Sequence, residues 1–302
     1  PPPRRPRPPL PIPQKLTLRF SYIKIMNPNQ ASYFFSEFSN YLATPNHRYL
    51  SWEHCYDAFQ HERNSPSPNF DLLSLHLAFY LASWGMYRGS SNLLQKDYLI
   101  HLNAINILWQ PKYNSLWGKV WADPRTDRAD IDLLFNQNGL IDELSTYYNN
   151  VGVSPTDTLI TKIIMGTMGC LPAYDRFLRS GLAADGLIKN FGRNSFEAII
   201  NRYGTSIGFA LPNYTSMIHT NLVYPQMKII DCIYWQCGYY IDELDKEFKS
   251  HTGNTVSIIN SCSTSPLYRT TATLSKSGTG YSINGGPSLS LGSVVLAGWH
   301  KN

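Results

Sequence analysis

The feature that most constrains the fold of this chain is a long helical pattern near its C-terminal end. Between residues 225 and 248, apolar side chains are separated alternately by three and four residues; they are Met227, Ile230, Tyr234, Cys237, Ile241, Leu244 and Phe248. A helix places such positions on one face, so the pattern predicts a single helix over 225–248. The face could be a dimer seam across 227–248. A core stripe is the favoured interpretation, because further apolar residues widen it.

Shorter helices are predicted along the preceding chain from local start and stop signals. Ser51 can cap the segment WEHCYDAFQHER, and Ser154 followed by Pro155 is typical of a helix start. The predicted helices cover residues 52–63, 72–87, 92–109, 155–168, 172–181 and 194–204. No hairpin signal or useful period-two run separates them. We therefore expect an all-α fold, with a compact multi-helix domain over residues 26–250.

Residues 72–87 are the most apolar of these predicted helices. Apolar residues cover nearly the whole circumference, which predicts a central helix surrounded by the others. The segment is nevertheless shorter than the roughly eighteen uncharged apolar residues that a membrane span needs, and it contains His76. We therefore expect no membrane-spanning segment.

Two tails of different composition flank the predicted helical domain. Residues 1–25 are rich in Pro and Arg, which predicts polyproline II or disorder, because proline lacks the amide donor. Residues 251–302 contain no acid and are dominated by Ser, Thr and Gly. Such a segment has few core formers, so we expect a loose tail or weak β-hairpins.

The net charge of +5 comes from these tails and not from the predicted helical domain. Residues 37–247 hold all 21 acidic residues but only 16 of the 26 basic ones. A nucleic-acid interface would gather Lys and Arg on a structured face, so nucleic-acid binding by the helical domain is not expected. The N-terminal tail could still bind RNA or the ribosome. Its run RPRPPLP also resembles a ligand for SH3 domains, with Arg5, Pro8 and Pro11 as the contact residues.

Five cysteines are spread over the chain, at positions 55, 170, 232, 237 and 262. The odd count, the wide spacing and the absence of a recognisable secretory signal argue against a disulfide framework. Reduced, mostly buried thiols in a soluble cytoplasmic protein are the expected state.

Three groups of side chains are candidates for chemistry. On residues 51–63, His54, Asp57 and His61 share one helix stripe and could hold Zn²⁺ or Fe²⁺ if another helix supplied a ligand. A solvated polar face is the favoured interpretation, so no metal or other cofactor is expected.

The second candidate is a stripe on the predicted central helix, formed by His76, Tyr80, Ser83 and Tyr87. It could line a ligand pocket in which Arg88 and Arg176 hold an anion. It could equally be an internal hydrogen-bond network that sets the helix register, and this interpretation is favoured.

The third candidate is Cys170, which lies between two predicted helices, just before the second begins. The helix dipole there favours a thiolate, as a nucleophilic cysteine requires. A general base would have to come from elsewhere in the fold, from His76, His101 or His219. A packing role is the more common one for a single cysteine at such a junction.

Three stretches resemble a family of uncharacterised bacterial helical proteins of unknown function. They are LHLAFYLASWGMYRGSSNLLQKDYLIH, MGTMGCLPAYDRF and YWQCGYYI, and the resemblance covers residues 26–248. It implies a helical fold and carries no activity, cofactor or site residue with it. It also makes SH3 binding less natural, since that use of proline is chiefly eukaryotic.

These observations leave three hypotheses about function. The first is a binding or interaction protein with a role in bacterial defence or stress. The second is an enzyme with a pocket near His76, Tyr80, Arg88 or Cys170. The third is a protein that binds its partner through the N-terminal tail.

Overall fold

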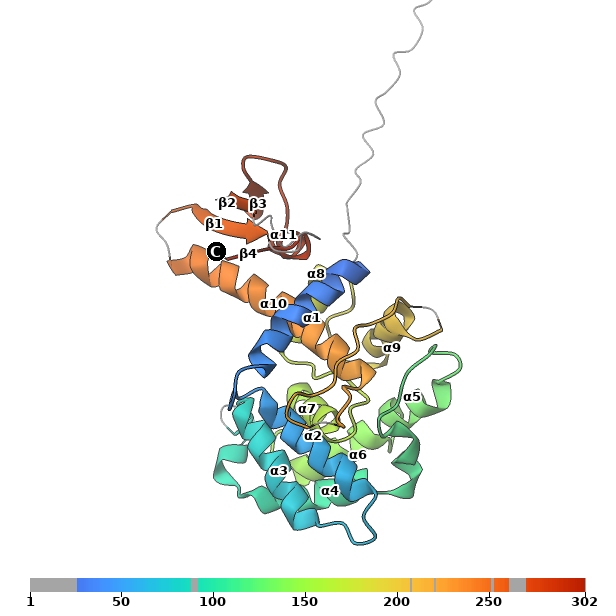
Figure 1. Cartoon of the computed structure of the whole chain (residues 1–302). Coiled ribbons are helices and arrows are strands. Elements are labelled where there is room, and N and C mark those ends of the chain that lie inside the picture. Colours follow the sequence, from blue (N-terminus) through green and yellow to red (C-terminus); the bar gives the residue numbers. More distant parts are fainter. Residues whose placement is uncertain are drawn as a thin grey trace, which may run out of the picture.

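A computed structural model describes residues 26–87, 92–206, 208–219, 221–250, 253–260 and 270–301 (Figure 1). The α-helices of these residues are α1 (Pro28–Leu42), α2 (Leu50–Arg63), α3 (Phe70–Ser83), α4 (Leu102–Leu108), α5 (Arg128–Phe135), α6 (Leu140–Asn150), α7 (Asp157–Thr167), α8 (Arg176–Ala184), α9 (Arg193–Tyr203), α10 (Gln226–Ser250) and α11 (Leu291–Leu296). Short 3₁₀ helices are η2 (Leu93–Gln95), η3 (Tyr98–His101) and η4 (Pro111–Leu116). The strands are β1 (Thr255–Asn260), β2 (Thr270–Ser277), β3 (Gly280–Ile283) and β4 (Trp299–Lys301).

The predicted helix over 225–248 is present as α10, which extends from the helical body to the C-terminal strands (Figure 1). Of its seven predicted stripe residues, all but Ile241 are buried. The stripe packs against α8 and α1, and near its end α10 contacts α11 and β4. The structure thus confirms the interpretation as a core stripe, because neighbouring elements of the same chain cover it.

The crossing of α8 and α10 depends on two glycines. A Cβ atom at Gly181 would lie 2.2 Å from the carbonyl oxygen of Tyr234, and one at Gly238 would lie 1.9 Å from that of Phe177. Any side chain at either position would force the helices apart. The close approach brings the rings of Phe177 and Trp235 into edge contact, with centroids 4.9 Å apart.

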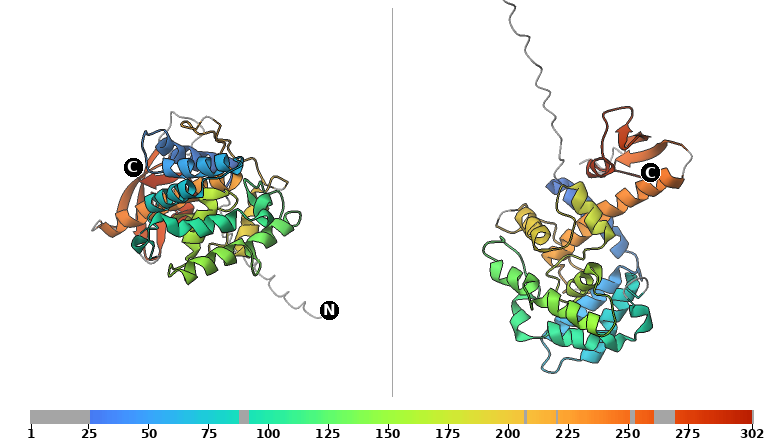
Figure 2. Two further views of the ribbon diagram at one scale, coloured as in Figure 1. Left: turned by 90° about the horizontal axis from the view of Figure 1, so that it is seen from below. Right: turned by 180° about the vertical axis from the view of Figure 1, so that it is seen from behind.

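The expectation of a purely α-helical protein is wrong, because a four-stranded antiparallel sheet follows α10. Its strand order is β3-β2-β1-β4, and Val256 of β1 lies opposite Leu274 of β2. Figure 2 shows the sheet and α11 together at the far end of α10. The protein is therefore mainly helical with a sheet near its C-terminal end.

The alternation of exposed and buried side chains explains why the strands of this sheet pack, although the composition of residues 251–302 predicted a loose tail or weak β-hairpins. In β1, Thr255 and Ser257 are exposed, whereas Val256 and Ile258 are buried. Few apolar residues per strand are enough, because α10 and α11 supply the other side of the core. The abundant Ser and Thr residues hide this period-two pattern.

The central position expected for residues 72–87 is also wrong. The inner side of α3 is buried, but Leu72, Leu75 and Phe79 are 41%, 51% and 59% exposed. The helix lies on the outside of the body, packed on α2, α7, α4 and η3 (Figure 1). Apolar residues all round a helix favour burial, but the number of neighbouring helices decides how much of it is covered.

Most helix boundaries differ from the predicted ones by a few residues, but the single helix predicted over 92–109 is wrong: the segment forms η2, η3 and the short helix α4. The helix expected from Pro172 begins at Arg176, because Asp175 caps it by accepting the amides of Phe177 and Leu178. The predicted cap Ser51 instead lies inside α2. Helices α1, α5 and α6 had no predicted counterpart. No helix of the described residues is long and apolar enough to cross a membrane.

Candidate functional site

A cavity of about 410 Å³ lies where α7, α8 and α10 meet the start of α2 and the end of α3. We call it the basic cavity. Its lining combines charged groups and aromatic rings, and consists of Arg48, Trp84, Met86, Thr158, Lys162, Asp175, Arg176, Phe177 and Trp235. These residues are distant in sequence, so the tertiary fold alone creates the cavity.

Lys162 is the least expected residue of this lining, because its ammonium group is buried. The residue is 3% exposed, and its Nζ lies 3.3 Å from Oδ2 of Asp175. It also lies 4.6 Å from the centroid of the Trp84 ring, a cation–π distance. The other Asp175 oxygen accepts two amides at the start of α8. This carboxylate is therefore shared between the helix terminus and Lys162.

A second buried ion pair extends the first one into the core. Nζ of Lys228 lies 3.1 Å from Oδ2 of Asp231, and the two residues are 3% and 6% exposed. Oδ1 of Asp231 accepts the amide of Ala173 at 3.0 Å. We call Lys162, Asp175, Lys228 and Asp231 the charged cluster.

The electrostatics of the charged cluster favour the charged form of Lys228. Burial alone would lower the pKa of Lys228, but interactions with its neighbours, Asp231 among them, outweigh burial and raise it. Burial raises the pKa of Asp231, against the opposing attraction of Lys228 and Lys162. Lys228 and Lys162 thus both attract the same carboxylate, that of Asp231, inside the helical core.

Two arginines lie at the rim of the basic cavity. The guanidinium of Arg48 stacks on Trp84 at 5.3 Å and donates to the carbonyl oxygen of Ser83 at 3.0 Å. The guanidinium of Arg176 is largely exposed and lies 3.5 Å from Asp242. In addition, the indole N–H groups of Trp84 and Trp235 are buried without an acceptor among the described residues.

The lining of the basic cavity therefore carries three cationic side chains against one carboxylate, with aromatic rings between them. Positive charge favours an anion, and the rings of Trp84, Phe177 and Trp235 favour a flat apolar surface. The arrangement suits a small molecule that combines a planar ring system with an acidic group.

Of the binding residues predicted from the sequence, the structure places only Arg176 in this lining. Tyr80 is 2% exposed, and its ring packs so closely on Gly166 that a Cβ there would lie 2.5 Å from it. The hydroxyl of Ser83 donates to the carbonyl oxygen of Phe79 in its own helix. His76 is half-buried, which lowers its pKa. Arg88 lies outside the described residues.

Tyr87 belongs to a different buried group, which we call the neutral chain. Its hydroxyl lies 2.9 Å from Nε2 of His101, and Nδ1 of His101 lies 2.6 Å from the hydroxyl of Tyr148. His101 is fully buried, and burial lowers its pKa to about 3. The imidazole is therefore uncharged at neutral pH. An internal network was the favoured prediction, but it joins Tyr87 to other helices and not to the rest of its stripe.

The predicted metal residues are only partly brought together. Nδ1 of His54 lies 3.0 Å from Nε2 of His219, and the other ring nitrogen of His219 lies 3.1 Å from Asp57. His61 is exposed and takes no part in this contact. Within the described ranges, no group of three or more His, Cys, Asp or Glu side chains could hold a metal ion.

Cys170 is fully buried, and burial raises the pKa of its thiol. This is the opposite of what a nucleophilic cysteine needs. Of its proposed bases, His101 is held between two tyrosines and His219 between Asp57 and His54. The environment of Cys170 favours the packing role.

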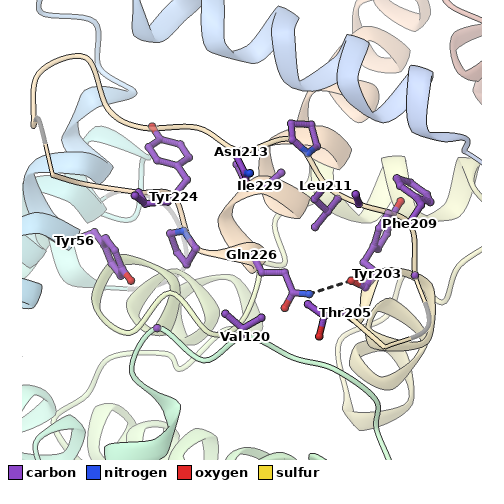
Figure 3. A pocket seen from close by; sticks show the side chains of 16 residues that line it. Tyr56, Val120, Tyr203, Thr205, Phe209, Leu211, Asn213, Tyr224, Gln226 and Ile229 are labelled. Atoms are coloured by element: carbon purple, nitrogen blue, oxygen red, sulfur yellow. Dashed lines mark hydrogen bonds between the residues drawn. The ribbon is translucent and has the colours of Figure 1, made fainter.

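A larger cavity of about 710 Å³ lies beneath the segment that leads into α10, and we call it the loop cavity (Figure 3). Tyr56 of α2, Val120, the end of α9 and residues 208–213 form its walls, and Gln226 of α10 lies at its floor. No charged side chain lines it. The two cavities therefore differ in the class of ligand that they suit.

Sequence reasoning missed Lys162, Asp175, Trp84 and Trp235 as lining residues. One signal was available for the buried lysines. Lys162 interrupts the apolar run LITKIIM, and Lys228 and Asp231 lie three apart in MKIIDCIYW. Charges inside an apolar helix face require buried partners. No signal of this kind marks the tryptophans, because aromatic residues occur throughout the core.

The peptide-motif residues Arg5, Pro8 and Pro11 lie outside the described residues, so tail-mediated binding stays a prediction. No protein-family model matches the chain, and the comparisons with curated proteins and with solved structures find no match either. The resemblance to bacterial helical proteins likewise stays a prediction.

Proposed function

We propose that this chain is a binding protein for a small planar anion, which it holds in the basic cavity. The observation that carries the proposal is the Lys162 ammonium, 3% exposed in the wall of an open cavity and stacked on Trp84. Burying a lysine is costly unless its charge is used. Asp175 neutralises part of that charge, and Arg48 and Arg176 at the rim add positive charge to the lining.

The geometry supports different contacts for the ring system and for the acidic group of the ligand. A ring system would lie among Trp84, Phe177 and Trp235, where apolar burial and stacking stabilise it. A carboxylate, sulfonate or phosphate group would lie toward Arg48 and Arg176, whose guanidinium groups suit planar oxyanions. The volume of about 410 Å³ is at the lower end for ligand sites, which favours a small ligand.

The first experiment uses the fluorescent aromatic anion 8-anilinonaphthalene-1-sulfonate as the probe. We expect saturable binding of one equivalent to the folded protein, weakened by added salt because exposed arginines contribute. Arg48→Gln and Arg176→Gln should each lower the affinity about threefold to tenfold, since each removes one charge-assisted contact.

Arg63→Gln is the matched control. Arg63 also stacks on a tryptophan, Trp117, at 4.5 Å, but it does not line the basic cavity. The proposal requires that this variant bind the probe like the parent. Equal losses for Arg63→Gln and Arg48→Gln would contradict a site in the basic cavity.

A competition experiment tests the charge of the ligand. Benzoate and benzyl alcohol have the same ring and similar size, but only benzoate is an anion. We expect benzoate to displace the probe at a concentration at which benzyl alcohol does not. If benzoate and benzyl alcohol displaced the probe at the same concentration, the site would be an apolar pocket without preference for anions, and the proposal would be overturned.

A further inference from the structure

The loop cavity has a different chemistry from the basic cavity, and its charge is the first difference. None of its lining residues is Lys, Arg, His, Asp or Glu. An ion that enters it would lose water without gaining a counter-charge, at a cost of several kcal/mol. The lining thus selects against ions and for uncharged molecules.

The walls of the loop cavity are largely aromatic and aliphatic. Tyr203 and Phe209 are in edge contact on one side, with centroids 5.2 Å apart, and Leu211 and Ile229 lie between them and Tyr56 (Figure 3). A cavity of about 710 Å³ with such walls has room for a ligand of up to four fused rings.

Several polar groups of the loop cavity are already hydrogen-bonded within the protein, and Gln226 is the first of them. Oε1 of Gln226 accepts the amide of Trp121 at 2.8 Å, and its Nε2 donates to the carbonyl oxygens of Trp121 and Tyr203 (Figure 3 shows the second bond). The Gln226 amide is therefore a fixed floor and not a free donor.

The hydroxyls of the three tyrosines that line the loop cavity differ in whether another protein group already binds them. The hydroxyl of Tyr203 pairs with that of Tyr234 at 2.5 Å, and the hydroxyl of Tyr224 donates to Glu53 at 2.5 Å. Tyr56 is 5% exposed, and its hydroxyl makes no hydrogen bond with any described residue. Tyr56 is thus the lining tyrosine whose donor is left for a ligand.

We infer that the loop cavity is a second binding site, which takes a neutral, largely apolar small molecule that accepts a hydrogen bond from the Tyr56 hydroxyl. This site is independent of the basic cavity, since no residue lines both. The acceptor on the ligand would satisfy a donor that the protein otherwise leaves almost buried.

Nile red is a suitable probe, because it is neutral, planar and has hydrogen-bond acceptors but no donor. We expect saturable binding with a blue shift of its emission. Val120→Trp should lower the affinity about tenfold or more, because Val120 lines the cavity, is 55% exposed and can carry a larger ring that occupies the space. Val223→Trp, from another wall and 60% exposed, repeats the test if the first variant is unstable.

Two controls locate the probe. Leu94→Trp adds the same ring at a residue that is 66% exposed and outside the cavity, and it should bind Nile red like the parent. Arg48→Gln should also leave Nile red binding unchanged, which separates this site from the basic cavity. Unsaturable binding, or equal affinity in Val120→Trp and Leu94→Trp, would overturn the inference.

Tyr56→Phe tests the hydrogen bond alone. Removal of one hydroxyl should weaken Nile red about threefold to tenfold, whereas Tyr98→Phe, an equivalent change outside the cavity, should have no effect. Equal affinities of Tyr56→Phe and Tyr98→Phe for Nile red would show that the Tyr56 hydroxyl donates no hydrogen bond to the ligand.

Discussion

The charged cluster and the neutral chain are two ways of burying polar side chains in one protein. The charged cluster pairs Lys162 with Asp175 and Lys228 with Asp231 beside an open cavity. The neutral chain places one uncharged imidazole, that of His101, between two hydroxyls. The first retains charge next to a space that a ligand can enter, and the second has its hydrogen bonds satisfied internally.

This difference separates a functional from a structural use of buried polarity. A buried ion pair is a poor way to gain stability, because desolvation offsets the attraction between the charges. A fully satisfied neutral network fixes how helices pack at lower cost. In the proposed function, Lys162 and Asp175 of the charged cluster take part in ligand binding, whereas the neutral chain sets the positions of helices. The following predictions test the two assignments.

The largest effect is expected for Asp231→Ala in the charged cluster. The substitution leaves the Lys228 ammonium buried without its partner and the Ala173 amide without an acceptor. Removing one member of a buried pair costs about 3–5 kcal/mol, so the free energy of unfolding in urea should fall by that amount.

Asp245→Ala on the same helix is the matched control for this loss. Asp245 pairs with Lys249 on the surface, where both side chains are exposed. Such pairs contribute little to stability, because water screens the two charges. Similar losses for Asp231→Ala and Asp245→Ala would remove the distinction between the buried cluster and an ordinary surface pair.

A smaller effect, with a characteristic pH dependence, is expected for the neutral chain. Burial lowers the pKa of His101 to about 3, from an ordinary value of 6.5. Below pH 6.5 the unfolded chain therefore binds a proton that the folded protein does not. The contribution of His101 to stability is complete above pH 6.5 and is lost as the pH falls toward 3, by about 1.4 kcal/mol per pH unit.

Between pH 7.5 and pH 5.0 the parent should therefore lose about 2 kcal/mol more stability than His101→Gln. Urea unfolding at the two pH values measures this difference. His61→Gln, at an exposed position, should keep the pH dependence of the parent. A His101→Gln variant with the same pH dependence as the parent would show that His101 does not stay neutral in the folded protein.

The smallest effect is expected for Tyr87→Phe at the end of the neutral chain. The substitution removes one hydrogen bond, from the hydroxyl to Nε2 of His101, and leaves the contact with Tyr148 in place. A loss of about 1 kcal/mol should follow, and binding of the anionic probe should be unchanged. Weaker probe binding by Tyr87→Phe would show that the neutral chain and the charged cluster do not act independently.

The sequence alone predicted the features that depend on neighbouring residues. The spacing of Met227, Ile230 and Tyr234 identified α10 as a long helix with a buried face. Start and stop signals placed α7 and α9 to within a few residues, although Thr156, and not Ser154, caps α7. These patterns are local, because a helix repeats every 3.6 residues and its termini require partners nearby.

Only the tertiary structure decided what lies next to what. Leu75 and Leu77 are both apolar residues of α3, yet one is 51% exposed and the other fully buried, because α2 and α7 cover one side of the helix. Lys162 of α7 and Trp235 of α10 share a cavity although they are 73 positions apart in the sequence. Phe177 of α8 joins them there, because Gly181 and Gly238 allow α8 to approach α10 closely. Periodicity sets which face of a helix is apolar, whereas cavities form where the packed faces of several helices leave space between them.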